Sequence, residues 1–262
     1  MKKRLDVYLV ENGYCESREK ARRLIMAGQV LVNTRAQKPS YEVRETDEVL
    51  VKQPEKYISR GGYKLEKALQ VFDIGLHGLC CVDVGASSGG FTDCMLQQGA
   101  RKVYCVDVGY GQLHYKLRND PRVVVMERTN ARMLEKAMFA DPLQFASVDV
   151  SFISLKLIFP ALSACLTADA QVCALIKPQF EVGRGQVGKN GVVRDAAVHA
   201  DTVRMVTGYA QTAGLYPVAV DYSPIKGPEG NIEFLLYLLK TPAEEVSAQQ
   251  IDQMVQKAHA GL

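Results

Sequence analysis

The sequence predicts an α/β fold: a doubly wound, seven-stranded sheet that follows a small N-terminal α/β domain. Two observations predict the sheet. Apolar runs of strand length alternate with helical periodicity between residues 63 and 240, and a loop of small residues follows the first run, at Gly85 to Gly90. A third observation sets the N-terminal domain apart. Residues 1–64 hold 14 Lys and Arg against 9 Asp and Glu, a net charge of 14 − 9 = +5. The whole chain has a net charge of +3, so the surplus positive charge lies in this N-terminal part.

Residues 1–52 are expected to form the N-terminal domain. Residues 4–12 have helical periodicity, and Ser17 is a suitable N-cap for a second helix that ends near residue 27. The segments GQVLVN and DEVLVK then predict two short strands separated by polar turns.

The second helix is basic on two faces, with Arg18 and Arg22 on one and Lys20 and Arg23 on the other. Such a helix suits phosphate backbones, but a charged run is more often a solvated surface, and charge alone does not decide between them. The pattern S-R-x-x-A-x-x-L-I-x-x-G-x-V-x-V-N, from Ser17 to Asn33, resembles the RNA-binding domain first named in ribosomal small-subunit protein four. With that resemblance, RNA contacts are expected from Arg4, Arg18, Lys20, Arg22, Arg23 and Arg60.

A polar linker with Pro54 is expected over residues 53–62, before the larger domain of residues 63–240. The expected strands are 80–85, 102–107, 123–127, 145–150, 171–176, 216–222 and 232–239. No long helix separates the last two, which therefore predict an antiparallel hairpin at the edge of the sheet. Residues 241–262 predict a weakly amphipathic helical tail without evident chemistry.

The composition excludes several classes of protein. The seven cysteines form no C-x-x-C pair, so neither a disulfide framework nor a zinc site is expected, and a reduced, cytoplasmic protein is. The N-terminus lacks the apolar region of a secretory signal. The most apolar stretch, FISLKLIFPALSACL, is too short to span a bilayer, so no membrane insertion is expected.

The glycine loop indicates a cofactor. Its pattern, Asp-x-Gly-x-x-x-Gly-Gly, lacks the G-x-G-x-x-G spacing of dinucleotide-binding sites, which makes a nicotinamide dehydrogenase the least favoured reading. The pattern resembles the first motif of S-adenosylmethionine-dependent methyltransferases, within a Rossmann-like sheet. Asp107, at the end of the next strand, would accept hydrogen bonds from the ribose hydroxyls of S-adenosylmethionine. The expected cofactor residues around this loop are Asp83, Gly85, Ser87, Gly89, Gly90, Asp107 and Asp149.

The acceptor is indicated by the segment after the fourth strand, Ser147 to Phe152. It contains neither the Pro-Pro-aromatic turn of amine methyltransferases nor the Pro-Cys of cytosine C5 enzymes. The strand end carries an isolated carboxylate instead. Together with two lysines and a glutamate it gives a set that resembles that of FtsJ-type ribose 2′-O-methyltransferases: Lys64, Asp149, Lys177 and Glu233.

These residue types suit a ribose hydroxyl, which is a poor nucleophile and must lose its proton as it attacks. Lys177 is the candidate for taking that proton or for stabilising the developing alkoxide as a cation. Asp149, Lys64 and Glu233 would orient Lys177 and the ribose hydroxyl for in-line transfer. Each has an ordinary structural alternative, such as a surface lysine or a charged edge-strand residue. His114 and His199 are expected at the surface, without a role.

The whole chain from about residue 2 to 240 resembles the TlyA family, through KxISRGGxKL, DVGASSGGFTD, DVSFISL, LIKPQFE and GKxGVVRD. The resemblance implies an rRNA (cytidine-2′-O)-methyltransferase that acts on small-subunit rRNA, large-subunit rRNA or both. It also implies that Asn130, in ERTNAR, contacts the adenine of the cofactor.

The hypothesis is therefore a cytoplasmic, metal-independent enzyme that uses S-adenosylmethionine, with rRNA or ribosomal subunits as its partner. Two alternatives remain. Members of the family are often named haemolysins, but a membrane-active haemolysin or cytolysin needs a spanning or strongly amphipathic segment that the sequence lacks. The second alternative is a non-catalytic RNA-binding regulator. The complete set of four candidate catalytic residues argues against it.

Overall fold

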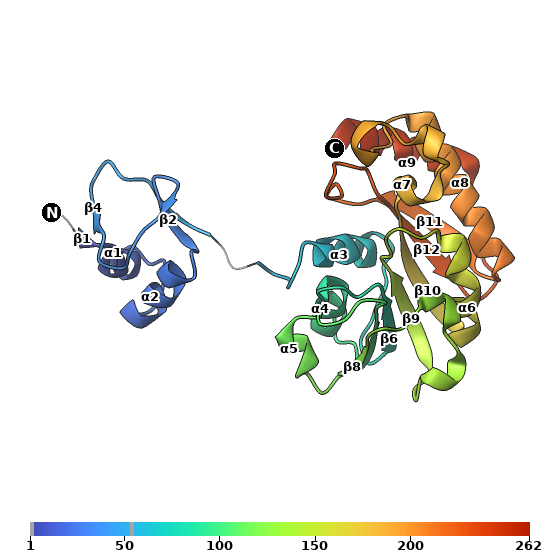
Figure 1. Ribbon diagram of the computed structural model, residues 1–262, viewed down its shortest axis with the longest axis horizontal. Coiled ribbons are helices and arrows are strands. Elements are labelled where there is room, and N and C mark those ends of the chain that lie inside the picture. Colours follow the sequence, from blue (N-terminus) through green and yellow to red (C-terminus); the bar gives the residue numbers. More distant parts are fainter. Residues whose placement is uncertain (1–2, 53–54) are drawn as a thin grey trace. The chain divides into compact units, whose positions relative to one another are not determined.

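The computed structural model describes residues 3–52 and 55–262, which belong to two compact units (Figure 1). The first unit ends at Lys56 and the second runs from Tyr57 to Leu262. Within the described residues, no helix is both long enough and apolar enough to cross a membrane.

The N-terminal unit packs two helices against short strands. Ser17 caps α2 by accepting a hydrogen bond from the Lys20 N–H at 3.2 Å, as predicted. The helices are α1 (Leu5–Glu11) and α2 (Arg18–Met26), and the strands are β1 (Lys3–Arg4), β2 (Val30–Val32), β3 (Arg35–Ala36), β4 (Glu42–Val43) and β5 (Val49–Val51). β3, β2 and β5 form one sheet, and β1 pairs with β4. Leu5, Leu9, Ile25 and Val30 are buried between the helices and strands.

The larger unit contains the predicted seven-stranded sheet, in the order β11-β12-β10-β9-β6-β7-β8. The strands are β6 (Cys80–Val84), β7 (Lys102–Val106), β8 (Val123–Met126), β9 (Leu143–Val148), β10 (Leu166–Ile176), β11 (Tyr216–Tyr222) and β12 (Phe234–Leu239). All the pairs from β10 to β8 are parallel, whereas β12 runs antiparallel to both β10 and β11. The edge hairpin is thus confirmed. β10 begins five residues before its expected start.

Helices cover both faces of this sheet (Figure 1). One face carries α3 (Gly61–Val71), α4 (Gly90–Gln97) and α5 (Tyr115–Arg118), and the other carries α6 (Phe159–Cys165), α8 (Ala196–Thr212) and α9 (Ala248–Gly261). Successive residues of β6 point to opposite sides, so Cys80 and Val82 join one apolar core and Cys81 the other. Because a parallel sheet is buried on both faces, its strands are continuous apolar runs.

The unit boundaries differ from the expected ones at both ends of the catalytic domain. Tyr57 is buried in the core of the larger unit, and the Ile58 N–H donates to the Asp93 carboxylate at 2.9 Å. Residues 57–62 therefore belong to that unit rather than to the linker predicted over 53–62, of which residues 53–54 lie outside the described part of the chain. The predicted tail of residues 241–262 contains α9, which buries Ile251 and Met254 in the core beneath α8.

The predicted surface position of His199 is wrong. Its side chain is fully buried in α8, where the ring meets Phe234 edge-on and its Nδ1 lies 2.9 Å from Nε2 of His259 in α9. The sequence around His199 is polar, but its side chain faces α9, which lies 60 residues further along the chain. Local periodicity does not reveal a contact between such distant segments. His114 is half-buried and caps α5 through its Nδ1.

Candidate active site

The glycine loop after β6 lies against the end of β9. Gly85 has a φ of +86°, and a Cβ there would lie 2.5 Å from the main-chain oxygen of Asp149. A Cβ on Gly90 would lie 2.2 Å from Ser59 Oγ and 3.0 Å from the Gly62 nitrogen. Glycine at these two positions therefore lets three segments of backbone converge on one point of the sheet edge.

Asp107, at the end of β7, fixes the other side of this loop. Its carboxylate accepts hydrogen bonds from the main-chain N–H groups of Ser87 at 2.8 Å and Gly109 at 2.7 Å. It lines a cavity of about 510 Å³. Gly85, Ser87, Asn130 and Asp149, all expected at the cofactor, also line this cavity. The Asn130 side chain accepts from the Arg132 N–H at 3.1 Å.

Two of the expected cofactor residues lie behind this surface. Asp83 is fully buried, accepts hydrogen bonds from Thr92 Oγ1 at 2.6 Å and Ser147 Oγ at 2.9 Å, and lines neither cavity of the site. Burial raises the pKa of its carboxyl to about 6. Gly89 also lines neither cavity; its φ of +97° begins α4. Both residues support the loop rather than face the space above it.

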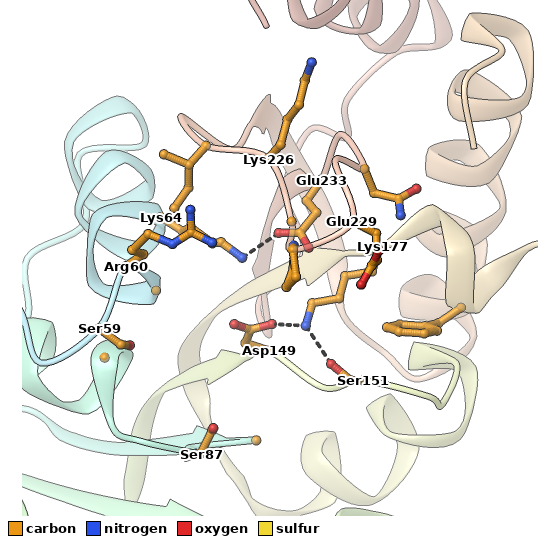
Figure 2. Close-up of a pocket in the computed structure, with 18 of the residues that line it drawn as sticks. Ser59, Arg60, Lys64, Ser87, Asp149, Ser151, Lys177, Lys226, Glu229 and Glu233 are labelled. Carbon is orange, nitrogen blue, oxygen red and sulfur yellow. Dashed lines mark hydrogen bonds and ion pairs between the residues drawn. The ribbon is translucent and has the colours of Figure 1, made fainter. Parts of the chain in front are cut away.

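The four expected catalytic residues meet in a second cavity of about 630 Å³ (Figure 2). Lys64 Nζ lies 2.5 Å from Glu233 Oε2, and Lys177 Nζ lies 2.6 Å from Asp149 Oδ1. Lys177 also donates to Ser151 Oγ at 3.0 Å. Figure 2 shows the Lys177 ammonium between Asp149 and Ser151, with Lys64 and Glu233 directed toward each other.

The sheet register brings these residues together. β10 lies between β9 and β12, and its residues Ala174 and Ile176 pair with Val148 and Phe234. Asp149 and Lys177 follow their parallel strands, whereas Glu233 precedes an antiparallel one, so all three lie at the same edge of the sheet. Lys64 reaches that edge from the first turn of α3. Gly90 and Arg60 line the same cavity.

The charges of the site balance in pairs. Glu233 is almost completely buried, and burial raises the pKa of its carboxyl, while the nearby Lys64 ammonium opposes that rise. A buried carboxylate without such a partner would be strongly destabilising. These four residues balance in charge, and the cavity is also lined by Arg60, Lys226 and Glu229.

The two cavities adjoin, and an exposed aromatic lies where they meet. Both are lined by Gly85, Ser87, Asp149, Ser151 and Phe152. The Phe152 side chain is 89% exposed, its φ is +62°, and its ring centroid lies 4.9 Å from that of Phe180. A left-handed conformation costs a residue with a Cβ about 1–2 kcal/mol. Sequence reasoning missed Ser151 and Phe152, although their place directly after a strand-end carboxylate was a usable signal.

The basic residues expected to contact RNA are arranged in two ways in the N-terminal unit. Arg4, Arg18 and Arg22 converge on the fully buried Asp6, with nitrogen–oxygen distances of 3.0, 3.1 and 3.3 Å. The Arg4 hydrogen bond contributes most to holding the pKa of Asp6 down, at about 2. Lys20 instead pairs with Glu16, just before α2, and Arg23 pairs with Glu19 on α2. Sequence reasoning missed Asp6.

Comparison with known proteins gives the family. The model of the FtsJ-like methyltransferases matches residues 57–240, and that of the S4 domain matches residues 3–49. The chain belongs to the FtsJ-like methyltransferase family. Its N-terminal S4 domain and its full-length relatives confirm the resemblance to the TlyA family.

Three relatives show how far the similarity extends. The 16S/23S rRNA (cytidine-2′-O)-methyltransferase TlyA of Mycobacterium tuberculosis is 44% identical, over 97% of this chain and 96% of its own length. A candidate rRNA methyltransferase of Bacillus subtilis, YqxC, is 49% identical over 100% of this chain and 95% of its own. A solved candidate hemolysin of Streptococcus thermophilus has a TM-score of 0.78 and 46% identity, covering 99% and 96% of the two chains.

Proposed function

We propose that this methyltransferase transfers a methyl group from S-adenosylmethionine to the 2′-hydroxyl of a cytidine ribose in rRNA, in the cytoplasm. The observation that carries the proposal is the pair of lysine–carboxylate contacts at one sheet edge, Lys177 with Asp149 and Lys64 with Glu233. The names of the full-length relatives support rRNA and cytidine as the substrate.

The cavity beside the glycine loop suits the cofactor. Within the described part of the chain Asp107 accepts two main-chain hydrogen bonds, and a carboxylate has further acceptor sites for the two ribose hydroxyls. Asn130 lines the same cavity and would contact the adenine, and Gly85 leaves room there because it has no side chain. When bound, S-adenosylmethionine supplies a methyl group on a positively charged sulfur.

The residues of the second cavity then handle the acceptor. Lys177, after giving up one proton to solvent, takes the proton from the 2′-hydroxyl as the oxygen attacks, and Asp149 and Ser151 hold the resulting ammonium in place. Lys64 and Glu233 form the opposite wall and orient the ribose for in-line attack. Phe152 offers an exposed ring on which an unpaired base can stack.

The N-terminal unit supplies RNA affinity. Three arginines around one buried carboxylate leave a net charge of about +2 on one face, and Asp6 holds the guanidinium groups in fixed positions. Ordered arginines suit phosphate oxygens because their forked donors match that geometry. The S4 domain match supports this role.

The test is methyl transfer in vitro from radiolabelled S-adenosylmethionine to rRNA from cells that lack this protein. A methylated ribose has no free 2′-hydroxyl, so the bond that follows it resists alkaline cleavage. We expect the label in alkali-resistant dinucleotides that begin with cytidine. Label in free mononucleotides would indicate methylation of a base and would reject the proposal.

A further inference from the structure

A carboxylate that the proposed reaction does not use holds the loop after β9. Glu181 ends the one-turn helix α7 (Pro178–Glu181). Its side chain accepts a hydrogen bond from Ser154 Oγ at 2.6 Å and another from the Leu155 N–H at 2.9 Å. It is partly buried, lines neither cavity, and burial raises the pKa of its carboxyl. Glu181 therefore contacts the loop without reaching the space where ligands would lie.

The held loop carries the strained aromatic residue. Its inner end is fixed by the Asp149 N–H, which donates to the Val84 oxygen at 2.9 Å, and its outer end is fixed by Glu181. Phe152 lies midway between these two points, with a φ of +62°. A residue other than glycine keeps such a conformation only where its surroundings impose it.

Two further side-chain contacts of this loop depend on the reacting lysine. Lys177 binds both Asp149 and Ser151, but it would change its protonation state and meet the substrate during the reaction. Glu181 lies four residues further along the same segment and is independent of that change. It links the segment of Lys177 to that of Phe152, as does the contact between the rings of Phe152 and Phe180.

We propose that Glu181 is a positioning residue that fixes the loop of residues 149–155, so that Phe152 and Ser151 face the RNA nucleotide in one arrangement. The RNA part of this inference rests on the proposed function, whereas the fixing of the loop does not. Glu181 touches neither substrate nor cofactor.

The chain contains no tryptophan, so Phe152→Trp introduces a single fluorophore into the loop. In this background Glu181→Ala should lower the fluorescence anisotropy of Trp at 152, because the freed loop moves within nanoseconds. Glu181→Gln should restore most of it, since an amide can accept from the Leu155 N–H and donate to Ser154 Oγ. Phe72→Trp, at a ring that stacks on Tyr237, is the matched control and should not respond to Glu181→Ala.

Catalysis provides the second readout. In the chain with Phe152 in place, Glu181→Ala should lower kcat/KM for rRNA by about a hundredfold, the loss expected from a misplacement of about 1 Å. The Kd of S-adenosylhomocysteine should change much less than kcat/KM, because Asp107 and Asn130 line the cofactor cavity from outside this loop, and Glu181→Gln should recover most of the activity.

Unchanged anisotropy at position 152, or an equal fall at position 72, would overturn the positioning role. If the anisotropy falls at position 152 alone but neither the parent chain nor any variant methylates RNA, the positioning role of Glu181 is supported and the proposed function is rejected. If Glu181→Ala does not fold, Ser154→Ala removes one of the two hydrogen bonds and is judged by the same criteria.

Discussion

At the scale of single residues, the site separates groups that face the ligands from groups that hold them. Asp107, Asn130, Asp149 and Lys177 line the cavities, whereas Asp83 lies beneath the glycine loop and bonds Thr92 and Ser147. Asp83, although part of the glycine-loop motif, therefore has a structural role. Its carboxylate joins β6, β9 and α4 at the point where the loop begins.

Gly85→Ala is expected to weaken cofactor binding. A Cβ there meets the main-chain oxygen of Asp149, and the φ of +86° disfavours it further. Strain of this kind costs on the order of 1–3 kcal/mol, so the Kd of S-adenosylhomocysteine should rise by about tenfold or more. Isothermal titration calorimetry measures this directly.

Gly208→Ala is the matched control. Gly208 lies within α8, and no atom approaches its ideal Cβ position within 4 Å. Alanine should leave cofactor affinity unchanged and raise the free energy of unfolding by up to about 1 kcal/mol, since glycine disfavours helices. Equal Kd values for the two alanine variants would contradict the account of the loop.

The residues that were predictable are those at strand ends. Asp149, Lys177 and Glu233 each adjoin an apolar run, and parallel strands end at a common edge, so their meeting could be expected from the sequence. The backbone conformation of Phe152 and the role of Asp6 were not predictable. The role of Phe152 depends on a backbone conformation, and that of Asp6 on three arginines that fold around it.

At the scale of elements, α9 packs against both α8 and β11, the edge strand of the sheet. His199 of α8 contacts His259 of α9, beneath the strand that begins next to Glu233. Burial, and to a lesser extent His259, lowers the pKa of His199 to about 4, below its ordinary value of 6.5, while Asp195 opposes the shift. The contact between α8 and α9 could not be predicted from the sequence, because His199 and His259 lie 60 residues apart.

The contribution of His199 to the stability of the protein should fall in mild acid, whereas that of Asp83, whose pKa is raised, changes in the opposite direction. Between pH 6.5 and 4 the unfolded chain binds a proton at His199 that the folded chain excludes, so this contribution to the free energy of unfolding decreases as the pH falls. The loss from His199 alone should be about 2 kcal/mol between pH 7.5 and pH 5. Urea unfolding of the parent and of His199→Asn at both values measures it. The same pH dependence in both proteins would show that His199 is not its source.

At the scale of the whole molecule, two units divide the work of one reaction. The larger unit contains the candidate catalytic residues, and the N-terminal unit contains three arginines held around Asp6. The seven strands were predictable because each contains a run of apolar residues, but the boundaries of the larger unit were not. Tyr57 lies in a polar segment and α9 is only weakly apolar, yet both add buried residues to its core.

Replacing Arg18 and Arg22 together by Gln should weaken RNA binding in a salt-dependent way. Arg4 keeps two hydrogen bonds to Asp6, so the N-terminal unit should remain folded. Each lost phosphate contact reduces the slope of log K against log salt by about 0.7–0.9. Filter binding of rRNA over a salt series measures this slope. Lys257→Gln, on the exposed side of α9, should leave it unchanged. An unaltered slope in the arginine variant would place the RNA contacts elsewhere.

The most direct test is to map ribose methylation by mass spectrometry on rRNA from cells that lack this protein and from cells supplied with it again. We predict a 2′-O-methylcytidine that is present with the parent chain and with Lys257→Ala, but absent with Lys177→Ala. Full methylation with Lys177→Ala, or no difference between cells with and without the protein, would contradict the central claim that this lysine activates a ribose hydroxyl.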